Sequence, residues 1–359
     1  MKIWTIIISI LFITNSFPQK LYSDTTCIVS SEFIYHKNDL PFPSCHASTI
    51  AETPDGLIAA WFAGTHENHP DVGIWLSRNI YGKWTKPVQV ADGIQNENLR
   101  YATWNPVLFY NYKTTLLFYK VGPNPASWWG EFISSNDNGK TWFAPTKLPK
   151  NILGPIKNKP ILMSNGELLC PSSAENNGWR VHIEFTSDMG LTWQRTEALN
   201  GNDSVSAIQP TILLHPDDKL QMLCRTKNGK IYTAWSTDKG RTWTKLTPTV
   251  LPSNNSGIDA VIMKDGRLLL VYNHINNTNR NILNVAISQD GINWEAAVIL
   301  ENDSNMSHEY SYPAVIQSKD EMIHITYTWR RELIKHVVID PSMIKTKSMI
   351  EGIWPVTTK

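Results

Sequence analysis

Short apolar runs joined by tight polar turns recur along almost the whole chain. Residues 49–51 and 57–61 flank a turn at Asp55-Gly56, and similar runs surround Asn165-Gly166 and Asp265-Gly266. Asp-Gly and Asn-Gly readily adopt the positive φ angles that tight hairpin turns require. Such hairpins lie near residues 55, 112, 165, 217, 265 and 320, and no long helical periodicity follows the N-terminal segment. The pattern therefore predicts an all-β protein made of six similar units.

A second motif recurs with a similar spacing. The sequence Ser/Thr-x-Asp-x-Gly-x-Thr-Trp begins at Ser135, Thr186 and Ser236, and degenerate copies begin at Ser77 and Ser288. The tryptophans that end the five copies are 58, 51, 50 and 51 residues apart. A repeat of this length is typical of one four-stranded propeller blade. The Asp and the Ser or Thr are suited to holding a hairpin turn by side-chain hydrogen bonds, so we interpret the motif as structural.

Together these patterns predict a six-bladed β-propeller of four-stranded antiparallel blades over residues 30–345, followed by a C-terminal tail at 346–359. The sixth unit has a hairpin at 312–328 and a third strand at 333–339, but no motif of the kind described above. We expect residues 33–36 to supply its fourth strand. This pairing would close the ring by joining the two ends of the chain.

The N-terminus has the pattern of a signal peptide over residues 1–22. Lys2 precedes an apolar run at 3–13 that is too short to span a bilayer. We therefore expect a secreted or periplasmic protein with no membrane association after cleavage. The four cysteines are widely separated, at positions 27, 45, 170 and 224. Their spacing indicates neither a metal site nor a redox site. Export would permit a disulfide, but Cys170 and Cys224 lie in apolar strand-like runs, where we expect buried free thiols.

Charge and aromatic content narrow the class of partner. The chain has 33 basic and 32 acidic residues and no basic stripe, which argues against nucleic acid, because that binding depends on clustered Lys and Arg. Fifteen tryptophans are many for 359 residues. Exposed indoles offer a flat apolar surface with a polar edge to sugar rings. We expect a glycan or oligosaccharide as the partner of a monomer that needs no cofactor and no metal.

The motif copies, their spacing and the six-unit count resemble the sialidase superfamily, whose members are also called BNR or Asp-box proteins. The resemblance covers roughly residues 34–340. It implies an active site at the axial end of the propeller, on loops remote from the Asp boxes. It also implies three arginines that bind the substrate carboxylate, a tyrosine nucleophile activated by a glutamate, and an aspartate acid/base.

Three positions match these roles and two depart from them. Arg225 and Arg280 match the second and third arginines, and Tyr310, followed by a serine, matches the nucleophile. His46 stands where the first arginine is expected, and Gln209 stands where the activating glutamate is expected. His46 could pair with a carboxylate when protonated, act as a general acid or base when neutral, or be structural. Gln209 cannot be a general base. Other glutamates could take over that role, although the sequence cannot place them; they are Glu309, Glu184 and Glu175.

The loop after the first hairpin offers the acid/base. Asp71 is the first candidate there and Glu67 the second. Equivalent positions of successive blades converge on one axial opening, so we also expect polar residues that open other blades to bind substrate. These residues, with two on neighbouring loops, are Asn105, Lys159, Asp259, Arg180 and His274.

Three functions fit these residues. The first is an exo-acting glycosidase of the sialidase type that removes a terminal acidic sugar. The second is a polysaccharide lyase on a uronate, in which His46 and Tyr310 serve as base and acid. The third is a non-catalytic propeller that binds glycans.

Overall fold

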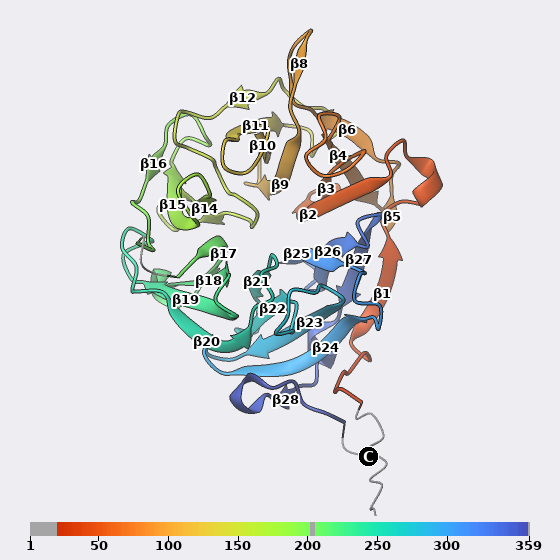
Figure 1. The fold of residues 1–359 in the computed structure, drawn as a ribbon, viewed down its shortest axis with the longest axis vertical. Coiled ribbons are helices and arrows are strands. Elements are labelled where there is room, and N and C mark those ends of the chain that lie inside the picture. Colours follow the sequence, from red (N-terminus) through yellow and green to blue (C-terminus); the bar gives the residue numbers. More distant parts are fainter. Residues whose placement is uncertain (1–19, 202–204, 358–359) are drawn as a thin grey trace, which may run out of the picture.

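Six β-sheets surround a central axis in the computed structural model, which describes residues 20–201 and 205–357. The first three blades follow the chain around the ring (Figure 1). Blade one contains β2 (Ser44–Thr53), β3 (Gly56–Gly64), β4 (Gly73–Ile80), β5 (Lys83–Trp84) and β6 (Val88–Ala91). Blade two contains β9 (Thr103–Tyr110), β10 (Thr115–Val121), β11 (Trp129–Ser135) and β12 (Thr146–Lys147). Blade three contains β13 (Ile161–Leu162), β14 (Leu168–Ala174), β15 (Arg180–Thr186) and β16 (Gln194–Arg195).

The remaining three blades complete the ring. Blade four contains β17 (Ala207–Leu214), β18 (Leu220–Thr226), β19 (Lys230–Ser236) and β20 (Thr247–Pro252). Blade five contains β21 (Asp259–Ile262), β22 (Leu268–Tyr272), β23 (Ile282–Ser288), β24 (Trp294–Asn302) and β28 (Lys347–Ser348). Blade six contains β25 (Tyr310–Gln317), β26 (Ile323–Trp329), β27 (Leu333–Ile339) and β1 (Ile28–Phe33). The sequence prediction of six antiparallel blades is confirmed.

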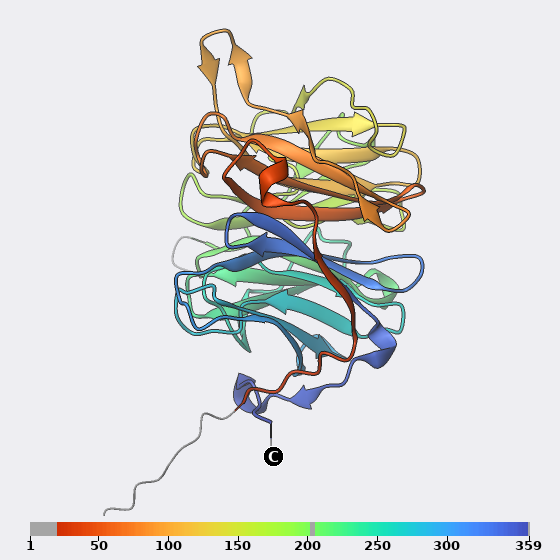
Figure 2. The same cartoon turned by 90° about the vertical axis from the view of Figure 1, so that its right-hand side faces the viewer.

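A few elements lie outside the blades. A two-stranded ribbon, β7 (Ile94–Asn96) and β8 (Leu99–Arg100), projects from the ring before blade two (Figure 2). Four short 3-10 helices are found at η1 (Lys37–Asp39), η2 (Pro216–Asp218), η3 (Pro341–Met343) and η4 (Ile350–Gly352).

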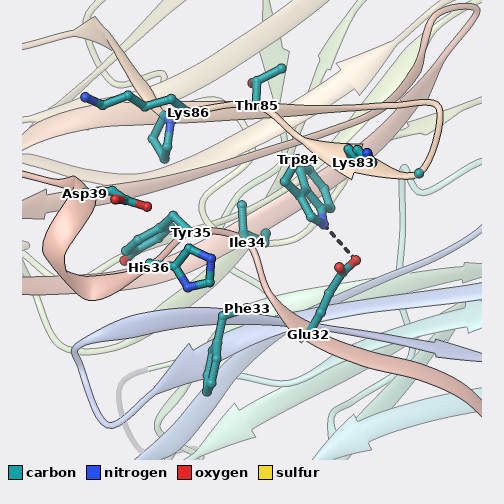
Figure 3. A pocket seen from close by; sticks show the side chains of 12 residues that line it. Glu32, Phe33, Ile34, Tyr35, His36, Asp39, Lys83, Trp84, Thr85 and Lys86 are labelled. Atoms are coloured by element: carbon teal, nitrogen blue, oxygen red, sulfur yellow. Dashed lines mark hydrogen bonds between the residues drawn. The ribbon is translucent and has the colours of Figure 1, made fainter.

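The ring closes through the two ends of the chain, as expected, but with an earlier segment than predicted. Strand β1 pairs antiparallel with β27, with Ser31 opposite Val337. The predicted segment 33–36 shares only Phe33 with this strand. Figure 3 shows the cavity of about 450 Å³ beside the closure, where Glu32 accepts a hydrogen bond from the Trp84 indole of blade one at 3.1 Å.

The Asp boxes hold turns between the third and fourth strands of their blades. In blade three, the Asp188 carboxylate accepts hydrogen bonds from the Thr192 amide at 2.8 Å, the Thr192 hydroxyl at 2.6 Å and the Thr186 hydroxyl at 2.9 Å. The Thr192 hydroxyl and amide lower the pKa of Asp188 to about 2. The Trp193 indole donates to the carbonyl of Gly190 within the same turn. These bonds are internal to the turn, which agrees with the structural interpretation of the motif.

The blades pack against one another through apolar layers. Between blades one and two, Ile58, Leu76, Leu108 and Leu117 belong to one cluster and are at most 2% exposed. Fully burying a side chain of this kind stabilises a fold by about 1.5–3 kcal/mol. All four cysteines are buried and free, which was expected for Cys170 and Cys224, and burial raises the pKa of the Cys45 thiol to about 12.

The C-terminal segment packs on blade five. Strand β28 extends the blade-five sheet by pairing with β24, and the Trp354 indole donates to the carbonyl of Tyr22. The Tyr22 amide in turn donates to the carbonyl of Pro355. Almost all of the predicted signal peptide lies outside the described residues. Within residues 20–201 and 205–357, the model contains no helix of the length and apolarity that a membrane span requires.

Candidate active site

The innermost strand of each of four blades contains a β-bulge, and these bulges orient side chains at one end of the ring. In β25, Tyr312 and Pro313 together lie opposite Tyr327, because the register shifts between Ser311 and Ala314. Strands β2, β9 and β17 shift at equivalent places. The first residue of each bulge has a positive φ: Ala47 (56°), Asn105 (29°), Gln209 (53°) and Tyr312 (51°). A bulge re-aims its side chain, so the four blades present these residues in a common way.

Tyr312 is the centre of a cluster that draws on four blades. Its hydroxyl accepts hydrogen bonds from Arg225 Nη1 at 2.7 Å and from Gln209 Nε2 at 3.3 Å. The Arg280 guanidinium lies 5.6 Å from the centre of the Tyr312 ring, and the His46 ring lies 4.2 Å from it. Arg225 also donates to Gln209 Oε1 at 3.0 Å. The structure thus brings together His46, Gln209, Arg225 and Arg280, which the sequence indicated separately.

Tyr310, the predicted nucleophile, lies apart from this cluster. Its hydroxyl donates to Asp303 Oδ2 at 2.6 Å and accepts from Arg330 Nε at 3.2 Å, and its ring belongs to the core between blades five and six. The bulge that begins after Ser311 breaks the alternation of the strand. Consequently Tyr312, two residues later, occupies the place beside Arg225 that we expected for Tyr310.

A partly buried carboxylate, Glu309, organises the arginines next to the cluster. Glu309 accepts from Arg280 Nη1 at 2.7 Å and from Arg331 Nε at 2.8 Å, and Arg331 Nη1 also contacts Glu67. Burial alone would raise the pKa of Glu309, but the neighbouring His46 and the two guanidinium groups together outweigh it and hold that pKa below its usual range. The carbonyl of Arg331 accepts from the Cys45 amide, which places this arginine beside the start of β2.

Arg331 therefore brings a third guanidinium close to His46, where the sequence lacks the first expected arginine. We did not identify it from the sequence. The one sequence feature that points to Arg331 is the pair of adjacent arginines in the short turn between β26 and β27. This feature indicates a role near His46 only when it is known that blade six adjoins blade one.

His46 is buried and neutral. Burial, followed by the charge of Arg331, lowers the pKa of the imidazole well below 6.5, although Glu309 opposes this effect. Its Nδ1 lies 2.9 Å from the Thr328 hydroxyl and 3.9 Å from Glu309. Because the ring is neutral at pH 7, its contact with Glu309 is not an ion pair.

Lys159 and Asp259 are engaged in ties between blades. The Asp259 carboxylate accepts from Lys159 Nζ at 3.0 Å, from the Thr211 hydroxyl at 2.9 Å and from the Val315 amide at 2.8 Å. These contacts join blades three, four, five and six. The two residues lie at the axis, as expected. Their charged groups, however, form most of their contacts with each other and with neighbouring strands.

The other predicted residues lie around the edge of the cluster or away from it. Asn105 occupies the blade-two bulge. Asp71 accepts from the Thr65 amide and hydroxyl and lies 2.7 Å from His69 Nδ1. His274 contacts the Tyr272 hydroxyl and lies against Trp354 near the C-terminal segment, where burial lowers its pKa to about 4.

The pKa values of Asp71 and Glu175 are shifted in opposite directions. Burial tends to raise the pKa of Asp71, but the bonds from Thr65 outweigh it and lower that pKa overall. Glu175, on the loop after β14, has a raised pKa because burial outweighs the opposing influence of Arg225. The Arg225 guanidinium lies 5.1 Å from the ring of Trp179 on the same loop. From the sequence, Glu175 was only one of three glutamates that could replace the missing activating base, because the sequence cannot show that its loop approaches Arg225.

Residues 55–325 match the family described as BNR repeat-like domain. The chain belongs to this family. A curated sialidase of Bacteroides fragilis (strain YCH46) is 25% identical over 240 residues, which are 57% of this chain and 42% of that protein. The matched region thus spans less than half of the length of that relative.

Solved structures show the same fold. The Hadza microbial sialidase Hz136 has a TM-score of 0.75 at 17% identity, with 88% of this chain and 69% of that chain covered. The intramolecular trans-sialidase of Ruminococcus gnavus, in complex with oseltamivir carboxylate, has a TM-score of 0.70 at 15% identity, with 90% and 99% covered. A protein of unknown function from Dyadobacter fermentans has a TM-score of 0.69 at 17% identity, with 87% and 98% covered. The BNR chain is therefore a sialidase-like propeller in its fold.

Proposed function

We propose that this BNR protein is an exo-acting glycosidase that removes a terminal acidic sugar from a glycan or polysaccharide. The observation that carries the proposal is the meeting of Arg225 and Arg280 at the buried hydroxyl-bearing ring of Tyr312. A guanidinium group forms two parallel hydrogen bonds with a carboxylate, so a pair of them favours an acidic sugar over a neutral one. The relationship to sialidases supports the same class of substrate.

The chemistry follows from the positions of the side chains. Arg225 and Arg280, with Arg331 behind them, bind the carboxylate of the sugar. Tyr312 lies where it can attack the anomeric carbon or stabilise charge that develops there. Glu175 donates the proton to the leaving oxygen, because its raised pKa keeps the acid form available nearer to neutral pH, which the lowered pKa of Asp71 does not.

The test is product analysis with matched tyrosine variants. The purified protein is incubated with 3′-sialyllactose and with oligosaccharides that end in a uronic acid, and released monosaccharides are measured by mass spectrometry. We expect release of one acidic sugar, a loss of about 100-fold or more in Arg225→Ala and Tyr312→Phe, and near-normal rates in Tyr310→Phe. Sensitivity of Tyr310→Phe together with an active Tyr312→Phe would show that our assignment of the tyrosine is wrong.

A second candidate is a polysaccharide lyase on a uronate. It is favoured by the contact of Tyr312 with Gln209, which has no carboxylate to remove the phenol proton, and by the neutral His46 ring 4.2 Å from Tyr312. In this reaction His46 would take the proton next to the carboxylate and Tyr312 would protonate the leaving oxygen. An unsaturated product absorbs in the near ultraviolet, whereas a hydrolysis product does not. Tight binding of the glycan with no product of either kind would identify a non-catalytic binding protein.

We also propose export of the chain and a monomeric state. The motive for export is the apolar run at residues 3–13 after Lys2. N-terminal sequencing of the protein purified from its producing cells should find a start near residue 22, and an intact Met1 would contradict the proposal. Light scattering should give a mass close to that of one chain.

A further inference from the structure

A groove of about 980 Å³ lies between blades two and three. One wall is formed by residues 125–129 after β10, and the other by Glu175 on the loop after β14 and Arg180 at the start of β15. Residues 147–153 form its floor. The groove opens among the loops that follow the second strands of the blades, which is the same end of the ring as Tyr312.

The groove is held open by a buried carboxylate. Glu184 is fully buried and accepts from the amides of Leu153 at 3.0 Å and Gly154 at 2.6 Å. The same carboxylate lies 2.8 Å from Nε2 of His182, which lines the groove. Because these bonds fix the floor to β15, the groove is preformed and a ligand need not order it.

Basic residues outnumber acidic residues along the groove. Its lining includes four basic side chains, Lys147, Lys150, Arg180 and Arg195, against two acidic ones, Glu175 and Glu197. Lys150 and Arg195 are exposed, and within the part of the chain that the structure describes neither has a carboxylate within 4.0 Å. Arg195 donates to backbone carbonyls, including that of Asn151 at 2.9 Å. Positive charge that no neighbouring carboxylate neutralises attracts an anionic ligand.

The loop after β14 contributes to the groove and also approaches the axial cluster. Glu175 lines the groove, and Trp179 on the same loop lies 5.1 Å from the Arg225 guanidinium. A glycan whose terminal sugar lies at Tyr312 can therefore extend outward past this loop. The volume is at the upper end of the roughly 300–1,000 Å³ that is typical of ligand clefts, which is more than one sugar ring needs. Asn176, Asn177 and the indole of Trp129 provide hydrogen-bonding groups and apolar surface of the kind that sugars contact.

We propose that the groove between blades two and three binds the acidic sugar units that follow the terminal one, so that the protein acts on anionic oligosaccharide chains rather than on short glycosides. The proposal rests on the proposed function for the orientation of the chain. The contacts that it adds are those of Lys150 and Arg195 with carboxylates of the second and later sugars.

Binding measurements test the groove separately from catalysis. Calorimetry at low salt compares N-acetylneuraminic acid with its α2,8-linked trimer, and galacturonic acid with its tetramer, so that sialate and uronate chains are distinguished. Maltotetraose is the neutral control. We expect one of the two acidic chains to bind at least about tenfold more tightly than its monosaccharide. Lys150→Glu combined with Arg195→Glu should remove that gain and leave binding of the monosaccharide unchanged.

Lys113→Glu is the matched control, because Lys113 is an exposed lysine on the turn between β9 and β10 at the opposite end of blade two. Equal affinity for chain and monosaccharide in the unmodified protein would overturn the groove proposal and leave the proposed function standing. A chain that binds through Lys150 and Arg195, with no binding of either monosaccharide and no product released, would support the groove and contradict the proposed function. If no acidic sugar binds in any form, both proposals are wrong.

Discussion

The side chain of Gln209 lies next to the Tyr312 hydroxyl, where a basic group could accept the phenol proton. Its amide contacts the Tyr312 hydroxyl at 3.3 Å and accepts from Arg225 at 3.0 Å. An amide cannot accept a proton at neutral pH, so Gln209 cannot take the proton that the phenol must lose when it attacks. This one residue decides how strong a nucleophile Tyr312 can be.

The variant Gln209→Glu tests that conclusion. A glutamate of nearly the same shape would place a carboxylate within reach of the phenol, and general-base assistance is worth about 10²–10⁴-fold. We expect the rate of release of the acidic sugar to rise by about tenfold or more. Gln209→Leu, which removes both contacts, is the control. A rate that falls in Gln209→Glu would indicate that Tyr312 does not act as a nucleophile.

Glu175→Gln tests the identity of the proton donor. The raised pKa of Glu175 keeps its acid form populated at higher pH than that of an ordinary glutamate, so activity should decline as the pH rises above this pKa. We expect Glu175→Gln to lower kcat by about 100-fold or more and to abolish this decline in the pH–rate profile. Asp71→Asn is the matched comparison. If the decline persists in Glu175→Gln and disappears in Asp71→Asn, the assignment is reversed.

At the scale of strands, the hairpins could be predicted from the sequence because their turns depend on local chemistry. Asp-Gly and Asn-Gly specify a reversal wherever they occur between apolar runs. The bulges depend on packing around the axis, and simple alternation would place Tyr310 and Tyr312 on the same face. Asn105, Gln209 and Tyr312 are each followed by a proline. This is the one sequence signal that aligns these three positions. This signal places Tyr312 among the polar residues that open the blades, but it does not show that Tyr312 rather than Tyr310 lies beside Arg225.

Innermost strands also carry the polar ties between blades, and Thr211 tests their importance. Its hydroxyl, on β17, donates to the buried carboxylate of Asp259 at 2.9 Å and is itself almost fully buried. Thr211→Val keeps the shape but removes this donor. We expect the free energy of unfolding to fall by about 1–3 kcal/mol, measured by chemical denaturation. Thr114→Val, at a half-buried site on the turn between β9 and β10 of blade two, should change it by less.

For the whole molecule, closure of the ring joins residues about 300 positions apart. The missing sixth Asp box made this closure predictable, because a blade without its fourth strand leaves an unpaired edge. The position of β1 could not be derived, since its burial alternates weakly and most of its residues are exposed. Its register is instead supported by side chains. Glu32 contacts His336 at 3.1 Å and Trp84 at 3.1 Å, and His336 in turn lies 3.0 Å from His324.

The two histidines make the closure sensitive to acid. Burial, followed by the neighbouring His336, lowers the pKa of His324 to about 4, and burial lowers that of His336 although Glu32 opposes it. An unfolded histidine has a pKa of about 6.5, so the unfolded chain binds protons first as the pH falls. Stability is therefore unaffected by this pair above about pH 6.5, decreases between about pH 6.5 and 4, and changes little below that. For His324, the difference between the pKa values of the unfolded and folded states corresponds to a loss of at most about 3 kcal/mol in the free energy of unfolding.

Chemical denaturation at pH 7.0 and 4.5 measures this loss. In His324→Gln the free energy of unfolding should depend less on pH than in the unmodified protein, because one buried group that resists protonation is gone. His36→Gln removes an exposed histidine near the same closure and should leave the pH dependence unchanged. Equal pH dependence in His324→Gln and the unmodified protein would show that other groups cause the acid sensitivity. The buried His46 and His274 would then be the next positions to substitute, since the pKa of each is also lowered by burial.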